Sequence, residues 1–170
     1  MSIEIKLVDE YPEDQFNDLV ERNLESSGTF IRSWNYHFEG DKNFKKNGTK
    51  VRVGAFDRDR LIGLSWGMAE SRNRFMMHMS LVEAEYRDHG IYRKMLDIIL
   101  NETKVFDEVD SLHHIFNNRI ISYKLKRGFY IIGQDQCGML GPRIRLRYFH
   151  NPKLFEIMKY RVGLTDQPAL

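Results

Sequence analysis

The sequence predicts an α/β (α+β) fold, in which a mixed, mostly antiparallel sheet carries helices on both faces. Three short apolar segments, at residues 51–55, 61–68 and 75–82, are separated by polar turns and predict a meander of strands. An amphipathic helix pattern follows the third segment, and strand and helix patterns alternate through the rest of the chain. The predicted order of elements is β-α-α-β-β-β-α-β-α-β-β-α.

The composition indicates one globular domain spanning residues 1–170. Of these residues 42% are hydrophobic and 12% aromatic, which suffices for a packed core. A formal net charge of +2 argues against a nucleic-acid partner. No apolar run reaches the ~20 residues of a membrane span, and the acidic start MSIEIKLVDE is not typical of a signal peptide. We expect a cytoplasmic protein without membrane contact, and the single cysteine, Cys137, excludes an internal disulfide.

The N-terminal part predicts one strand and two helices. Residues 3–7 alternate between apolar and polar side chains and predict a strand that ends near Asp9. Pro12 opens a helix, which Gly28 interrupts. The aromatic segment 30–38 predicts a second short helix, packed on the sheet.

The middle of the chain predicts the meander and the helix after it. Residues 50–68 form a hairpin around a polar turn, and residues 75–82 form the third strand. The helix that begins at Ile91 has no clear stop before Lys104 or Phe106.

The C-terminal part predicts three strands and two helices. A strand at 111–116 precedes a helix at 118–126, which Gly128 closes. Strands follow from Phe129 and through 144–148, and Asn151-Pro152 caps a last helix. Arg143, Arg145 and Arg147 share one face of the last strand, either as a solvated edge face or as a docking site for an acidic partner.

The stretch Met79–Leu100 organises the rest of the chain. A strand, a loop that ends at Gly90 and a helix N-terminus follow one another. Free N–H groups and the positive end of the helix dipole converge there, so the stretch predicts an anion site.

Two motifs resemble the signatures of the GCN5-related N-acetyltransferases (GNATs). Arg87-Asp88-His89-Gly90-Ile91-Tyr92 resembles the loop motif Arg/Gln-x-x-Gly-x-Gly/Ala, from which Tyr92 departs. Residues 117–129 resemble Asn-x-x-Ala/Ser-x-x-x-Tyr-x-x-x-Gly-Phe. The resemblance covers roughly residues 51–129. It implies a GNAT-like twisted sheet and a loop that holds the pyrophosphate of acetyl-coenzyme A.

The resemblance also implies an activity. The implied enzyme is an acyltransferase that moves the acetyl group of acetyl-coenzyme A to a primary amine, of a small molecule or a peptide, by direct attack in a ternary complex. The implied cofactor-binding residues are Leu81, Val82, Arg87, Asp88, His89, Gly90, Ile91, Tyr92, Asn117 and Lys124. A backbone N–H around Leu81 or Val82 would stabilise the oxyanion, and the aromatic segment 30–38 would be a wall of the acceptor cleft.

The resemblance implies Tyr123 as the general acid, and Glu83, at the strand end nearest the expected thioester, is one of several candidates for the general base. The family's tyrosine usually stands four residues before the glycine, where this chain has Lys124; Tyr123 is one residue earlier, rotated by about 100° on a helix. The alternative for Tyr123 is a half-buried aromatic side chain. Lys124 is a charge partner for the phosphates or a solvated surface lysine.

A base is needed because an alkylamine is only about one part in a few thousand neutral at pH 7. Besides Glu83, the candidates are His78, which by alternation shares a face with Met76, Ser80 and Val82, and the adjacent pair His113 and His114. Each has a purely structural alternative. We expect no metal, since no further ligand stands at the right spacing beside the histidine pair, and we expect Cys137 to be a small apolar strand residue.

Two rival functions stay open at this point. The chain could be a catalytically silent coenzyme A-binding module, because the tyrosine is displaced. It could also transfer a longer acyl or an aminoacyl group. The acceptor has no decodable motif, and the final strand and helix allow a homodimer.

Overall fold

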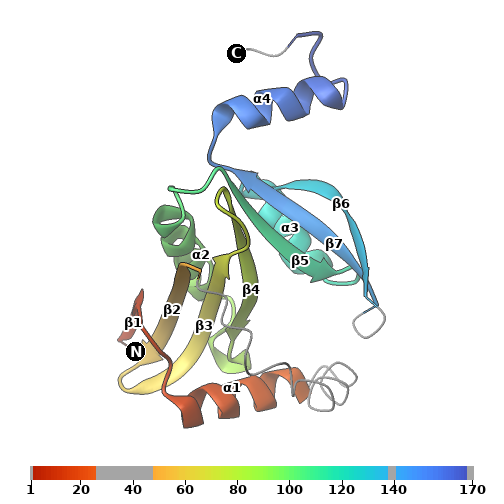
Figure 1. The fold of residues 1–170 in the computed structure, drawn as a ribbon. Coiled ribbons are helices and arrows are strands. Elements are labelled where there is room, and N and C mark those ends of the chain that lie inside the picture. Colours follow the sequence, from red (N-terminus) through yellow and green to blue (C-terminus); the bar gives the residue numbers. More distant parts are fainter. Residues whose placement is uncertain (1, 26–47, 138–140, 168–170) are drawn as a thin grey trace.

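The computed structural model describes residues 2–25, 48–137 and 141–167, and within them seven strands form one sheet in the order β1-β2-β3-β4-β5-β7-β6 (Figure 1). Neighbouring strands pair antiparallel, except for the parallel pair β4 and β5. The strands are β1 (Ile3–Leu7), β2 (Lys50–Asp57), β3 (Arg60–Ala69), β4 (Arg74–Val82), β5 (Glu108–His114), β6 (Tyr130–Cys137) and β7 (Gly141–Phe149). The helices are α1 (Glu13–Glu25), α2 (Ile91–Glu102), α3 (Asn118–Lys126) and α4 (Pro152–Arg161), with a 3-10 turn at Ala84–Tyr86. The predicted fold class is confirmed.

Helices cover both faces of the sheet. On one face Met95, Leu96 and Ile99 of α2 pack against alternate residues of β2 and β3, and the main core cluster extends to Phe129 and Leu146. On the other face Leu19 of α1 packs against Phe56, Leu61 and Leu64. The alternation of apolar residues in the central strands produces this two-sided core.

Some predicted boundaries differ from the structure. The helix α2 ends at Glu102, where Thr103 turns the chain and its hydroxyl donates to the Ile99 carbonyl oxygen at 2.7 Å. The strand β5 begins at Glu108 rather than residue 111, because polar Glu108 and Asp110 are strand residues held by arginines. The predicted helix at 30–38, and Gly28 before it, lie outside the described residues.

A β-bulge interrupts β4 at His78. Trp66 pairs with Met79 but Gly67 pairs with Met77, so the register shifts by one residue. Beyond the bulge Ser80 bonds Ser65 at 2.7 Å. The prediction that His78 shares a face with Ser80 and Val82 is therefore wrong, because the extra residue reverses the alternation. The His78 ring stacks on Trp66, at 4.8 Å between ring centres.

The strands β4 and β5 pair over a short length and then separate. Residues 74–77 of β4 pair with residues 108–111 of β5, while the remainder of β5 pairs only with β7 (Figure 1). We call the opening that follows Met77 and Ser111 the fork. It leaves the last residues of β4 paired with β3 alone.

The arginine-bearing strand β7 lies inside the sheet, between β5 and β6, so the prediction of a solvated edge face is wrong. Arg147 binds the fully buried Asp110 through two nitrogens, at 2.6 and 2.8 Å, and Glu108 at 2.7 Å. Arg145 also reaches Asp110, and Arg143 pairs with Asp135. These charges neutralise one another across strands.

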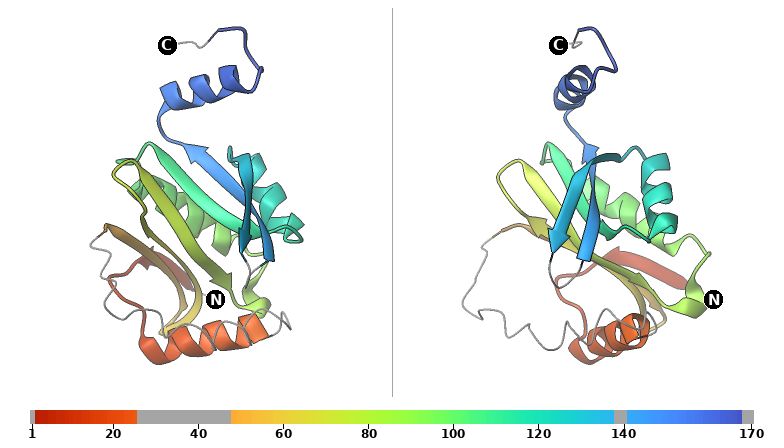
Figure 2. Two further views of the ribbon diagram at one scale, coloured as in Figure 1. Left: turned by 45° about the vertical axis from the view of Figure 1, so that its right-hand side comes forward. Right: turned by 90° about the vertical axis from the view of Figure 1, so that its right-hand side faces the viewer.

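The last helix, α4, stands beyond the end of the sheet in both views of Figure 2. Asn151 caps it as predicted, because its side chain accepts a hydrogen bond from the Lys153 N–H at 3.0 Å and Pro152 follows. None of the helices in the described residues is long and apolar enough to cross a membrane.

Candidate active site

The predicted anion site lies where β4 ends and α2 begins. Gly90 is the N-cap of α2, with a left-handed φ of 74°, and among the described residues no side chain caps the helix. The first intrahelical bond there runs from the Lys94 N–H to the Gly90 carbonyl oxygen. The N–H groups of residues 91–93 thus have no intrahelical partner, and a Cβ placed on Gly90 would meet no atom within 4 Å. The helix end is open to an anion.

The side chains of the loop stay clear of this helix end. Arg87 donates from Nε to the Val82 carbonyl oxygen at 3.0 Å and from Nη2 to Asn23 of α1 at 2.9 Å. Asp88 pairs with Arg119 of α3, and the His89 ring contacts the Arg87 carbonyl oxygen at 2.8 Å.

Ile91 and Tyr92, the residues after Gly90, are held in the core. Ile91 is buried, and Tyr92 packs edge-on against Tyr123 at 5.5 Å. A tyrosine at this position of the loop motif therefore leaves the helix end open. Its side chain turns inward, and its backbone N–H remains at the helix end. The exposed basic side chains of Arg93 and Lys94 lie in the same helical turn. The sequence motif did not single them out.

The backbone of β4 presents one side to the fork. The Glu83 N–H bonds the Ile62 carbonyl oxygen of β3 at 2.9 Å. Since successive N–H groups of a strand point to opposite sides, the Leu81 N–H also faces β3 and the Val82 N–H faces the fork. Of the two predicted oxyanion donors, the Val82 N–H faces the fork and the Leu81 N–H faces β3, and the role of either stays a prediction.

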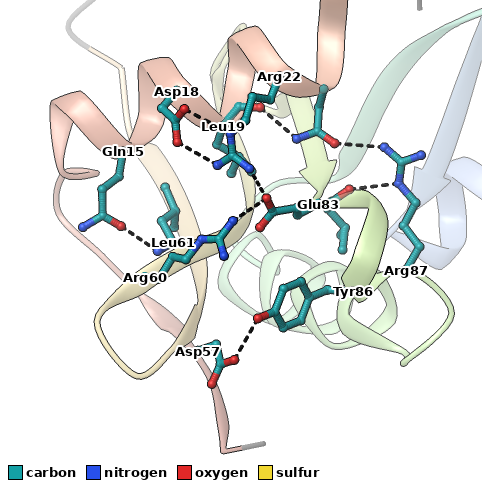
Figure 3. Close-up of polar contacts among 12 residues, drawn as sticks. Gln15, Asp18, Leu19, Arg22, Asp57, Arg60, Leu61, Glu83, Tyr86 and Arg87 are labelled. Carbon is teal, nitrogen blue, oxygen red and sulfur yellow. Dashed lines mark hydrogen bonds and ion pairs between the residues drawn. The ribbon is translucent and has the colours of Figure 1, made fainter. Parts of the chain in front are cut away.

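Glu83 is buried in an ion-pair cluster between α1 and the sheet (Figure 3). Its Oε1 accepts hydrogen bonds from Arg22 and, at 2.6 Å, from Arg60, while Arg22 also pairs with Asp18. Its Oε2 is buried and has no hydrogen-bond partner among the described residues. A surface depression of about 420 Å³ beside the cluster is lined by Gln15, Asp18, Arg22, Asp59, Arg60 and Leu61. Glu83 as general base stays a prediction, and its visible role is to fasten α1.

Lys124 lies at the fork, so the predicted solvated surface lysine is wrong. Its side chain is 1% exposed, and its Nζ lies 3.4 Å from the Met77 sulfur and 4.7 Å from the centre of the Phe129 ring. Met77 is the last residue of β4 that pairs with β5. Burial lowers the pKa of the Lys124 ammonium to about 7. No carboxylate pairs with Lys124 among the described residues.

His113 lies near Lys124 in the core. Its Nε2 is 3.1 Å from the Ser111 hydroxyl, and burial, reinforced by Lys124, lowers its pKa to about 3. A neutral imidazole of such low basicity is a poor base for an amine. His114 faces the other side, where its Nδ1 accepts a hydrogen bond from the Phe116 N–H.

Tyr123 points elsewhere than Lys124. It packs on Tyr92 of α2, burial raises its pKa, and its hydroxyl is buried without a hydrogen-bond partner among the described residues. Asn117 caps α3, because its side chain accepts a hydrogen bond from the Ile120 N–H at 3.4 Å. Tyr123 as general acid and Asn117 as a cofactor contact stay predictions.

Solved structures share the fold of this chain over most of its length. The chain superposes on PaiA N-acetyltransferase from Thermoplasma acidophilum in complex with coenzyme A with a TM-score of 0.66 and 20% identity, covering 88% of this chain and 99% of that one. For an aminoglycoside 6'-N-acetyltransferase complexed with coenzyme A the TM-score is 0.62 and the identity 16%, with coverage of 86% and 97%. The NatC complex bound to Gag peptide and CoA gives 0.64 and 19%, with coverage of 88% and 99%.

The chain has the GNAT fold. No family model matches it, and no curated protein matches it in sequence. In the GNAT fold of this chain, the two predicted motifs lie side by side, since Asp88 of the loop pairs with Arg119 of α3.

Proposed function

We propose that this protein is an acetyl-coenzyme A-dependent N-acetyltransferase that acts on a primary amine. The observation that carries the proposal is the juxtaposition of an uncapped α2 N-terminus with an open fork at the end of β4, on a GNAT fold. The relatives of known structure in complex with coenzyme A support the same co-substrate here.

The residues present fit acetyl-coenzyme A. The N–H groups of residues 91–93, with the helix dipole behind them, would hold the pyrophosphate, and Gly90 leaves the approach clear. The edge of β4, which has no strand partner beyond Met77 among the described residues, would bind the pantetheine arm as an added strand, through the Val82 N–H. The thioester of the bound co-substrate would then lie near the fork, where the Val82 N–H would stabilise the developing oxyanion.

The acceptor amine must be neutral to attack. A base assists this step by about 10²–10⁴-fold. His78 is exposed at the β4 bulge, stacked on Trp66, on the face opposite α2. We place the acceptor on this face and keep Glu83 and His78 as candidate bases.

A panel of amines tests the activity. Thiol release from acetyl-coenzyme A should depend on the amine and saturate, after calorimetry has established coenzyme A binding. A calorimetric titration that shows no binding of acetyl-coenzyme A or coenzyme A to the intact protein would end the proposal. The amine panel should include aminoglycosides and peptides, because the names of the similar structures mention an aminoglycoside in one case and a bound peptide in the other.

A silent coenzyme A-binding module is the second candidate. It is favoured by the pairing of Glu83 with two arginines and by the low pKa of His113, which leave few groups to act as a base. Such a module would bind coenzyme A and release no thiol with any amine. Turnover with a single amine decides against it.

A further inference from the structure

We infer that Lys124, and not Tyr123, supplies the proton that the coenzyme A sulfur takes up when it leaves. This inference rests on the proposed function. Three properties of Lys124 support it: its position beside Met77 at the fork, its charge, and the proton balance of the reaction.

Position favours Lys124. Its Nζ touches the sulfur of Met77, the residue at which the β4–β5 pairing stops. A chain that enters the fork along β4 would end against this amino group. Tyr123, about 100° around the helix, packs instead against Tyr92 between α2 and α3.

Charge points to the same group. A fully buried amine among a thioether and an aromatic ring has no anion to balance it, since no carboxylate pairs with Lys124 among the described residues. Buried charges are normally paired, so this one is unsatisfied until an anion arrives. A thiolate formed in the fork would be that anion.

The proton balance closes without a further reactant. The acceptor nitrogen bonds to the carbonyl carbon, and the carbon–sulfur bond breaks with its electron pair on sulfur. Sulfur takes a proton from Nζ and leaves as the thiol, while Lys124 becomes neutral, the form that burial favours. The acceptor nitrogen loses its proton to base or water, and Lys124 is reprotonated from solvent.

Lys124 is poised for this step near neutral pH. Its pKa of about 7 keeps a usable fraction protonated, and proton donors act best near the working pH. His113, which interacts electrostatically with Lys124, has a pKa of about 3 and stays neutral in that range, and burial raises the pKa of Tyr123, the preceding residue of α3. Neither competes for the proton between pH 6 and 9.

The test is the ionisation of the thiol of bound coenzyme A, followed by thiolate ultraviolet absorbance against pH. We expect the wild-type protein to lower the pKa of the bound thiol, and Lys124→Met to raise it by about one to three units relative to wild type. Lys126→Met, which removes the same charge from an exposed site on α3, should leave it unchanged. With an active amine, Lys124→Met should lower kcat by about 10²-fold or more with little change in KM for acetyl-coenzyme A.

The possible outcomes distinguish a failure of the proposed function from a failure of the role assigned to Lys124. If the wild-type protein binds no coenzyme A, the proposed function fails and this inference fails with it. If coenzyme A binds but its thiol titrates identically in wild type and Lys124→Met, only the assignment of Lys124 is overturned. A shift in Tyr123→Phe and none in Lys124→Met would overturn it in favour of the tyrosine.

Discussion

Replacing Lys124 by methionine should stabilise the protein. The side chain is 1% exposed and its amino group touches only apolar or weakly polar groups among the described residues. Methionine has a similar length and no charge to bury. We therefore expect Lys124→Met to raise the free energy of unfolding, in contrast to most core substitutions.

The magnitude follows from the pKa of Lys124. A fall from 10.5 to about 7 means that burying this group costs about 5 kcal/mol when both states are protonated, at 1.36 kcal/mol per unit. Between pH 7 and 10.5 the unfolded chain carries a proton here that the folded protein has lost, so stability rises with pH. The cost is about 4 kcal/mol at pH 7 and about 2 kcal/mol at pH 9.

Urea unfolding at pH 7 and pH 9 checks this prediction. The stabilisation by Lys124→Met should shrink by about 2 kcal/mol from the lower to the higher pH, and Tm at pH 7 should rise by about 10 °C. Lys126→Met, on the exposed face of the same helix, should change stability by less than about 0.5 kcal/mol at either pH. A stabilisation that is equal at both pH values would refute the conclusion that burial lowers the pKa of Lys124.

Three further substitutions test other parts of the structure. Gly90→Val should weaken coenzyme A binding about tenfold by calorimetry, because restoring a left-handed loop costs about 1–2 kcal/mol; Gly163→Val, with φ of 73° and equally open space but far along the chain, should not. Asp110→Asn should destabilise by about 3–5 kcal/mol in urea unfolding, because it leaves Arg147 poorly paired in the sheet, and an effect below 1 kcal/mol would contradict this reading. Gly67→Ala should lower Tm, costing about 1–3 kcal/mol, because its Cβ would collide with the Met76 carbonyl oxygen; Gly133→Ala, in open space, serves as the control.

Within the described residues, the local patterns predict the elements and the uncapped helix N-terminus at Gly90 well. Gly90 and Gly128 have positive φ, as a loop glycine before a helix and a helix-ending glycine should. Their roles depend on a few neighbouring residues, so spacing alone sufficed. The element boundaries around Asp110 were missed because its charge is neutralised by Arg147, a residue distant in sequence.

The orientation of site residues was harder to predict, because it depends on tertiary structure. His78 is turned by a bulge that alternation cannot reveal. The motif predicts the position of Lys124 on a helix. It does not predict its burial, because that depends on Met77 and Phe129 from other elements. The sequence suggests an edge strand for the β7 arginines because β7 is the last strand of the chain, whereas in the sheet it lies between β5 and β6.

The parallel pairing between β4 and β5 is short, so the sheet consists of two parts, β1–β4 and β5–β7, that are joined by few backbone hydrogen bonds. Four described pairs of residues join β1–β4 to β5–β7, and at the closed end of the fork Arg74 adds a bond to Glu108 at 3.0 Å. Beyond these four pairs, along the fork, the backbone edge of β4 has no strand partner in the described residues. A ligand that fills the fork would therefore act as a missing strand, so that occupancy should stiffen the whole sheet and couple the motion of α2 to that of α3.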